Sequence, residues 1–310
     1  MKLRWLVFGF VVFVGGEVAQ ATEYLKSPIP SKIRLAPTTY DQTLLDIIGE
    51  KGKKPRWHVV QWGIVPPFPN ITDCLGSCSD RTWQVQNTSE SGRVLFTSTP
   101  SEGNIVEFTQ DTTGSKFSGC DPAQEFDLFI EPNSAGTHPG YPVGLIESRR
   151  PVLGAVSNLH IQIRQQIVSV QQGTRCNPPY NVGATLMALV FGNDVTGEAL
   201  FYQVITYDSR GATSNGAWYF TSSPYGVNDD VTLYGQPFLT PGTSSILYDI
   251  DVAARLRTLI QTSPHLPGEP TGPSKNPANW KLSDAYFGSL VNGEARIVSR
   301  HSQIRLFSDN

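Results

Sequence analysis

Residues 158–171, NLHIQIRQQIVSVQ, carry the pattern that decides the fold. Positions 159, 161 and 163 are leucine or isoleucine, and positions 160, 162 and 164 are polar. A period of two residues is typical of a β-strand that buries one face and exposes the other. The alternation slips near Gln165 and Gln166, where we expect a β-bulge.

Strand-like stretches occur along most of the chain. Residues 184–191, ATLMALVF, are apolar on both faces, which indicates a central strand, and a turn at 193–197 joins them to a strand at 199–208 as a hairpin. Eight more stretches are bounded by turn-forming residues: 57–65, 82–87, 93–99, 104–110, 123–133, 217–224, 280–288 and 294–307. This pattern predicts an all-β fold, a two-sheet antiparallel β-sandwich of the jelly-roll type.

Only two short helices are expected, at residues 39–49 and 248–262. The second has an apolar stripe, and Asp249 or Asp251 can cap its N-terminus. Residues 226–230 are expected to form a turn. The proline-rich residues 263–279 predict a long irregular loop.

The first 21 residues are typical of a secretory signal peptide. A short basic start precedes an apolar run at 5–14, and Ala19-Gln20-Ala21 is a small-x-small cleavage site. The apolar run is shorter than the ~20 residues that a membrane span needs. We therefore expect cleavage near Ala21, secretion to the extracellular space or periplasm, and no membrane span. The mature chain would comprise an N-terminal extension at 22–56 and a β-sandwich domain at 57–310, and we expect a monomer.

Charge and motifs exclude several function classes. The formal net charge is −3 and no basic cluster occurs, so the electrostatic signature of nucleic-acid binding is missing. The common motifs of NTPases, dinucleotide-binding proteins, zinc proteases and α/β-hydrolases are also absent from the sequence.

Four cysteines in a chain with an export signal indicate two disulfides, for which three connectivities are possible. We expect Cys74–Cys78 as a local bridge and Cys120–Cys176 as a longer one; a zinc site is the alternative, although the spacing is unusual for zinc. Asn70 and Asn87 each begin a glycosylation sequon.

Residues 123–133, AQEFDLFIEPN, place three acids on one strand face. In a strand, Glu125 and Asp127 have Cα atoms ~7 Å apart, and two carboxyl groups that close tend to raise one pKa, as a general acid requires. Glu125 and Glu131 are ~20 Å apart, so they can act together only if the strand bulges. Alternatively, the acids form an ordinary solvated face.

Glu125-Phe126-Asp127 resembles a motif of the concanavalin A-like lectin and glucanase superfamily. In its retaining β-glucanases one strand reads E-x-D-x-E or E-x-D-x-x-E. The resemblance implies that Glu125 is the nucleophile or base and that Asp127 supports it. Phe129 or Ile130 occupies the acid/base position, which Glu131 reaches only through a bulge.

The same stretch resembles the metal site of legume-type lectins, in which a strand reading EFD is followed by Asn, Asp and His ligands. This resemblance implies a metal site formed by Glu125, Asp127, Asn133 and His138. Ca²⁺ would be the candidate cofactor because the ligands are mostly oxygen atoms.

These features together predict a secreted carbohydrate-active protein whose partner is an extracellular glycan or polysaccharide. The candidates are a glycoside hydrolase or polysaccharide lyase, a non-catalytic lectin, and a structural or adhesive protein without a site. His160 and Arg164 are candidate substrate-binding residues from a polar row, and Trp218 and Tyr225 are candidate sugar-stacking rings. Whether the chain is an enzyme is open at this level.

Overall fold

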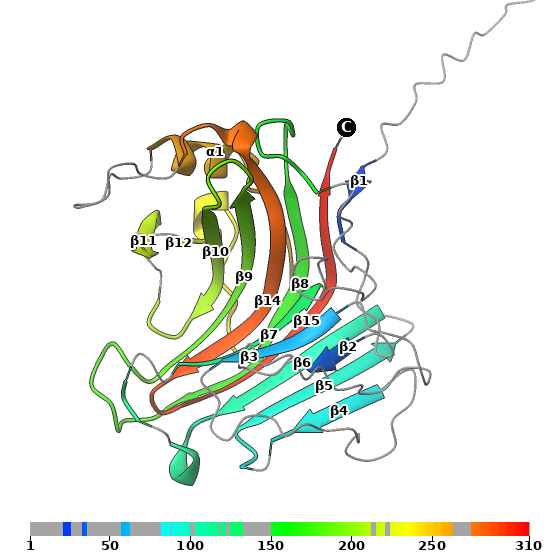
Figure 1. Ribbon diagram of the computed structural model, residues 1–310. Coiled ribbons are helices and arrows are strands. Elements are labelled where there is room, and N and C mark those ends of the chain that lie inside the picture. The colour runs from blue at the N-terminus through cyan, green and yellow to red at the C-terminus, as the bar shows by residue number, and fades with distance from the viewer. Residues whose placement is uncertain are drawn as a thin grey trace, which may run out of the picture.

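The computed structural model describes most of the chain beyond residue 80 and short segments before it, and it is a two-layer β-sandwich (Figure 1). The described residues are 21–25, 33–35, 57–62, 82–87, 89–99, 103–117, 119–121, 125–132, 150–211, 215–220, 224–262 and 274–309. The predicted all-β sandwich is confirmed. No described helix has the length and apolarity that a membrane crossing requires.

The first layer is a seven-stranded sheet with the order β13-β8-β15-β6-β5-β4, and β1 also pairs with β15. Its strands are β1 (Thr22–Glu23), β4 (Thr82–Gln86), β5 (Gly92–Thr99), β6 (Gly103–Asp111), β8 (His160–Gln172), β13 (Ile246–Asp251) and β15 (Ala295–Ser308).

The second layer is an eight-stranded sheet with the order β11-β12-β10-β9-β14-β7-β3-β2, in which the pairs β10–β12 and β2–β3 are parallel. Its strands are β2 (Ile33–Leu35), β3 (Trp57–Trp62), β7 (Phe126–Pro132), β9 (Val182–Asn193), β10 (Ala199–Asp208), β11 (Ala217–Phe220), β12 (Tyr225–Asp230) and β14 (Trp280–Asn292). The N-terminal segment expected to be an extension thus contributes β1 and β2 to the two sheets.

The hydrophobic core lies between the two sheets, where the inward residues of every long strand are apolar. Ile161 and Ile163 of β8 and Leu128 and Ile130 of β7 are fully buried there. Helix α1 (Ala253–Thr262) closes one end of the sandwich with its buried face (Figure 1). Asp251 caps this helix, since its Oδ1 accepts the backbone N–H of Ala253 at 3.0 Å.

A chain of polar side chains crosses the core. Gln165 donates to Nδ1 of His301 at 3.0 Å, and His301 Nε2–H donates to Ser299 at 3.0 Å. Ser299 donates to Ser289 on the other sheet, which in turn donates to Gln110. This order of donors requires a neutral His301, and burial lowers the pKa of His301 to about 3.

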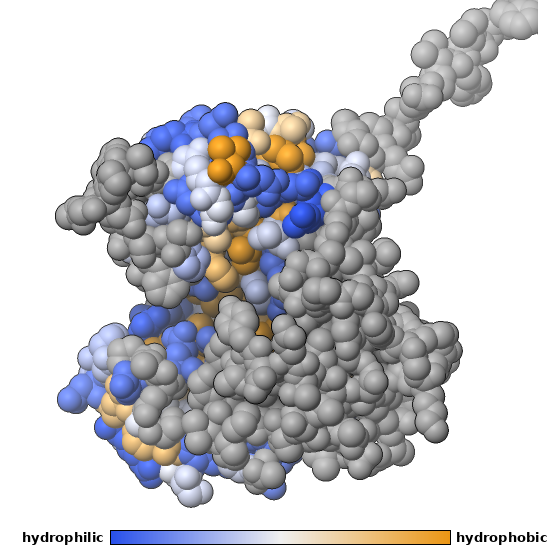
Figure 2. Space-filling view, in the orientation of Figure 1, coloured by the Kyte–Doolittle hydropathy of each residue, from blue (hydrophilic) through white to orange (hydrophobic). Residues whose placement is uncertain are grey.

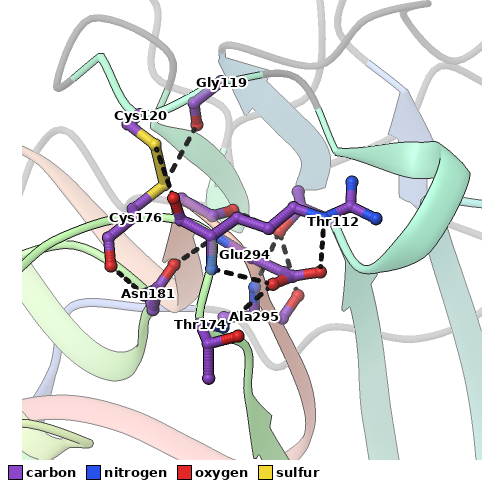
Figure 3. Close-up of a disulfide and its surroundings, with 10 residues drawn as sticks. Thr112, Gly119, Cys120, Thr174, Cys176, Asn181, Glu294 and Ala295 are labelled. Carbon is purple, nitrogen blue, oxygen red and sulfur yellow. Dashed lines mark hydrogen bonds and ion pairs between the residues drawn. A yellow bond between two sulfur atoms is a disulfide. The ribbon is translucent and has the colours of Figure 1, made fainter.

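The predicted Cys120–Cys176 disulfide is present, with the two Cα atoms 5.5 Å apart (Figure 3). Asn181 donates its side-chain amide to the carbonyl oxygen of Cys176 at 2.7 Å and accepts the backbone N–H of Glu294 at 2.9 Å. The Glu294 carboxylate accepts the backbone N–H of Thr174 at 2.9 Å. These contacts join the segment that leads into β7 to the β8–β9 connection and to the β14–β15 turn.

Several sequence predictions are wrong in detail. The expected turn at 226–230 is strand β12, because these residues pair with β10 and β11 and the side chain of Asp229 binds Arg255. The helix predicted at 248–262 begins only at 253, because residues 246–251 pair with β8 and bury alternate side chains. The bulge in β8 lies at Val168, beyond the expected position.

Other predictions fall on residues outside the described ones: the signal peptide, the helix at 39–49, the Cys74–Cys78 bridge and the sequon at Asn70. Asn87 is described and is only 2% exposed. Its side-chain nitrogen donates to Ser91 at 2.7 Å, and its Oδ1 accepts the backbone N–H of Gly92 at 3.0 Å. A glycan on Asn87 would need space that this buried side chain does not have in the folded protein.

We predict that Gly288→Ala destabilises the protein, because a Cβ at residue 288 would lie 2.2 Å from the carbonyl oxygen of Leu128 and 2.7 Å from the Cα of Phe129. The two central strands would have to move apart, at a cost of ~1–3 kcal/mol in the free energy of unfolding. The matched control is Gly192→Ala, whose Cβ would have one neighbour, at 3.9 Å. Denaturant unfolding of both variants tests this, and equal stabilities would contradict it.

Candidate active site on the eight-stranded sheet

The outer face of the eight-stranded sheet carries a second, smaller apolar cluster. It contains Phe129, Leu186, Ala188 and Ile205, with Phe238, Tyr286 and Leu290 packed against it. In Figure 1, β10, β9 and β14 curve around the left side of the molecule, and Figure 2 shows a hollow with hydrophobic atoms on that side. We call this face of the sheet the hollow face.

Glu125 and Asp127 meet at one end of the hollow face. Their side chains share a hydrogen bond, and Asn292 at the end of β14 also hydrogen-bonds to Glu125. Both residues are partly exposed, but the Oδ1 atom of Asp127 is buried and has no hydrogen-bond partner in the described part of the chain. The two residues form what we call the first carboxyl pair.

The first carboxyl pair has two different electrostatic environments. Burial, reinforced by the charge of Glu125, raises the pKa of Asp127 well above its usual range. Burial also raises the pKa of Glu125, but the positive charge of Arg210 and hydrogen bonds from Asp127 and Asn292 act in the opposite direction. Asp127 is therefore the member that keeps its proton, and Glu125 is the member that ionises first.

A second carboxyl pair, Glu131 and Asp284, lies farther along the same face. The two side chains share a hydrogen bond, and each residue is 4% exposed. Burial raises the pKa of Glu131 to about 7, and burial and the charge of Glu131 raise the pKa of Asp284. Tyr286 hydrogen-bonds to Asp284, and its ring stacks on that of Phe201 with centroids 6.3 Å apart.

A bulge in β14 brings Asp284 to the hollow face. The register of β14 against β9 shifts between Leu282 and Asp284. Leu282 and Ala285 both point into the core, so Asp284 points to the opposite side. Strict alternation from Leu282 would have placed residue 284 in the core, so the strand pattern of the sequence does not mark this acid as a site residue. An acid at a position that alternation assigns to the core is the signal that could have found it.

The two pairs are separate sites. Asp127 and Glu131 are four residues apart on a strand, which corresponds to ~13 Å between their Cα atoms. The pairing of β7 with β3 and with β14 runs without a register shift. The bulge that would bring Glu131 to the acid/base position beside Glu125 is therefore absent.

The structure does not bring the other candidate residues to the carboxyl pairs. His160 and Arg164 lie on the outer face of the seven-stranded sheet, with the whole sandwich between them and the hollow face. Tyr225 is 3% exposed, belongs to the core between the sheets, and contacts the partly buried Trp218 edge-on. Tyr225 is thus a packing residue.

The metal-site prediction involves two residues outside the described ranges, Asn133 and His138. Among the described residues, no group of three or more His, Cys, Asp or Glu side chains is arranged to hold a metal ion. The predicted metal site stays a prediction.

No protein-family model matches the chain, and no curated protein matches it. Among solved structures, the family 11 xylanase from Neocallimastix patriciarum aligns over 81% of this chain and 100% of its own, with 8% identity and a TM-score of 0.37. The family 12 xyloglucanase from Bacillus licheniformis aligns over 89% and 99%, with 10% identity and a TM-score of 0.34. Endoglucanase 3 from Trichoderma harzianum aligns over 76% and 100%, with 8% identity and a TM-score of 0.33. Likenesses this distant assign no activity to the chain.

We predict that Glu131 makes stability pH-dependent in a way that Glu131→Gln removes. The folded-state pKa of Glu131 is about 7 against an ordinary 4.5, so its contribution is fully present below pH 4.5 and is lost as the pH rises to about 7. The free energy of unfolding of the wild type should fall by about 3 kcal/mol over this range. The amide of Glu131→Gln does not ionise, so the variant should lack this decrease.

Denaturant unfolding of the wild type and Glu131→Gln at pH 4 and pH 8 measures this effect. The variant should gain stability relative to the wild type at the higher pH. The control is Glu90→Gln, at an exposed position in a turn. A wild-type-to-variant difference that is the same at both pH values would contradict the prediction, because it would show that folding does not raise the pKa of Glu131.

Proposed function

We propose that the protein is a glycoside hydrolase that cleaves a polysaccharide bound in the hollow, with Glu125 as the nucleophile or general base. The observation that carries the proposal is the first carboxyl pair: two acids in hydrogen-bond contact, partly exposed on a hollow sheet face that also carries aromatic side chains. Carboxyl groups with perturbed pKa values in a hollow are typical of catalytic sites.

The surroundings of Glu125 support its role as the reacting carboxylate. A protonated Asp127 donates a hydrogen bond to it, Asn292 provides another contact, and Arg210 contributes positive charge. Asp208 holds Arg210 in place, since Nη2 of Arg210 lies 2.6 Å from Oδ2 of Asp208. A carboxylate stabilised in this way remains ionised near the pH at which its partner is still an acid.

Asp127 supports Glu125 and is not the second reacting group. Retaining enzymes separate their two carboxyl groups by ~5–5.5 Å and inverting enzymes by ~6.5–9.5 Å, whereas hydrogen-bonded carboxyl groups are closer than either. The second carboxyl pair lies too far along β7 to serve Glu125. The supporting role of Asp127 is to keep Glu125 oriented and to set its pKa.

Aromatic rings on the hollow face support a sugar as the substrate. Phe201 of β10 and Tyr286 of β14 are partly exposed there, and their rings stack with centroids 6.3 Å apart. Aromatic rings combine large apolar faces with specific contact geometry, and sugar rings pack against such faces.

We predict that Glu125→Gln abolishes hydrolysis with little loss of stability, because the amide fills the same space and cannot act as a base or nucleophile. Loss of a reacting carboxylate should reduce kcat at least ~100-fold. Asp127→Asn should retain part of the activity and shift its pH profile, since the amide still donates a hydrogen bond to Glu125 but carries no titrating proton.

Reducing-end release from a panel of neutral and acidic polysaccharides measures this, with Glu90→Gln as a control at an exposed site between β4 and β5 of the other sheet. Absorbance of unsaturated products, recorded in parallel, would reveal a lyase instead. Equal release of reducing ends by the wild type and by Glu125→Gln would show that the reaction takes place at another site than the first carboxyl pair. No release and no unsaturated product from any polysaccharide would contradict the enzyme proposal and leave a binding protein.

A further inference from the structure

A small pocket opens on the outer face of the seven-stranded sheet, on the side of the sandwich opposite the hollow face. Its volume is about 40 Å³, and polar side chains from β8, β15 and the segment before β13 line most of it. Arg164 lies directly opposite Ser302, and Gln166 lies directly opposite Arg300, so four lining residues form a compact square. Ser245 completes the polar lining.

Two bulges bracket this square. On β15, Gln303 and Ile304 lie between Ser302 and Arg305, where β8 has a single residue. Gln303 has a positive φ of 52°, which few residues other than glycine adopt. On β8, Val168 is the extra residue of a second bulge. Bulges bend a strand and redirect its side chains, so they account for a pocket on an otherwise regular sheet.

Positive charge exceeds negative charge around the pocket. Arg300 Nε lies 2.8 Å from Oε2 of Glu107, and Arg93 Nη2 lies 2.8 Å from Oε1 of the same carboxylate. One carboxylate therefore serves two guanidinium groups.

Arg164 adds a further positive charge with no carboxylate against it. The one hydrogen bond of its side chain among the described residues is a long one, 3.4 Å from Nη1 to the Ser245 hydroxyl. No acidic side chain in the described part of the chain lies within ion-pairing distance of it. With Arg93, Arg300 and Glu107, the four charged groups sum to +2.

We propose that this pocket binds an oxyanion group, a carboxylate or a sulfate, carried by an acidic polysaccharide. The guanidinium fork of Arg164 matches the two oxygens of such a group, and the hydroxyls of Ser245 and Ser302 supply further donors. The volume holds a few atoms and excludes a sugar ring, so only the charged substituent enters while the polymer lies across the sheet. The site is independent of the carboxyl pairs of the hollow face.

Isothermal titration with an oligogalacturonide, and separately with sodium sulfate, tests the proposal on the full mature chain. Arg164→Gln should weaken binding of the oligosaccharide about tenfold or more, the effect of losing a charged hydrogen-bonding partner. The control is Arg296→Gln, which removes the same charge from β15 outside the pocket. Ser302→Ala retains every charge and removes one donor, so it should weaken binding less.

Comparable affinities for sulfate and oligogalacturonide, both lost in Arg164→Gln, would support an oxyanion site whose ligand is a free ion. Equal loss in Arg164→Gln and Arg296→Gln would reduce the effect to general surface charge and overturn the site. No binding of either probe to the wild type would also overturn it. Melting temperatures of all variants establish whether each is folded. If Arg164→Gln does not fold, the binding measured for Ser302→Ala still tests the pocket.

Discussion

The close contact between β14 and β7 is the constraint on which the candidate site depends. Gly288 lies opposite Phe129, and no side chain fits between the backbones there. This contact sets the positions of both carboxyl pairs, because the first pair belongs to β7 and its entry and contacts β14, and the second pair joins β7 to β14. Asn292 contacts Glu125 at one end, and Asp284 contacts Glu131 at the other.

Strand β14 contributes side chains both to the core and to the hollow face, and the alternation between these two faces is interrupted at one bulge. Before the bulge, Leu282 points into the core; after it, Ala285, Phe287 and Val291 do so. Asp284 and Tyr286 face the hollow, and Leu290 does so farther along the strand. One extra residue at the bulge therefore changes the face on which the following side chains lie, and it places Asp284 on the outer face.

The sequence predicts most of this fold because strand alternation is a strong signal where one face is buried. The boundaries of the strands near residues 93, 160, 199 and 295 follow from it, and so does the adjacency of Glu125 and Asp127 on one face. What the sequence could not predict depends on tertiary partners. Asp229 looks like part of a turn until Arg255 and Tyr202 bind it inside a strand. Asp284 reaches the site through a bulge, and Arg210 reaches it through a loop. Neither a bulge nor a loop has a regular pattern of apolar and polar residues that the sequence would reveal.

The buried titratable groups of the core and of the hollow face act on stability in opposite directions. His301 is neutral when folded, so it favours the folded state less as the pH falls from 6.5 toward 3. Glu131 is protonated when folded, so it favours the folded state less as the pH rises from 4.5 toward 7. Between pH 4.5 and 6.5 a rise in pH therefore has opposite effects on the free energy of unfolding through His301 and through Glu131. The raised pKa values of Asp127 and Asp284 act in the same direction as that of Glu131. The pKa shifts of Glu131 and His301 therefore favour the highest stability at weakly acidic pH.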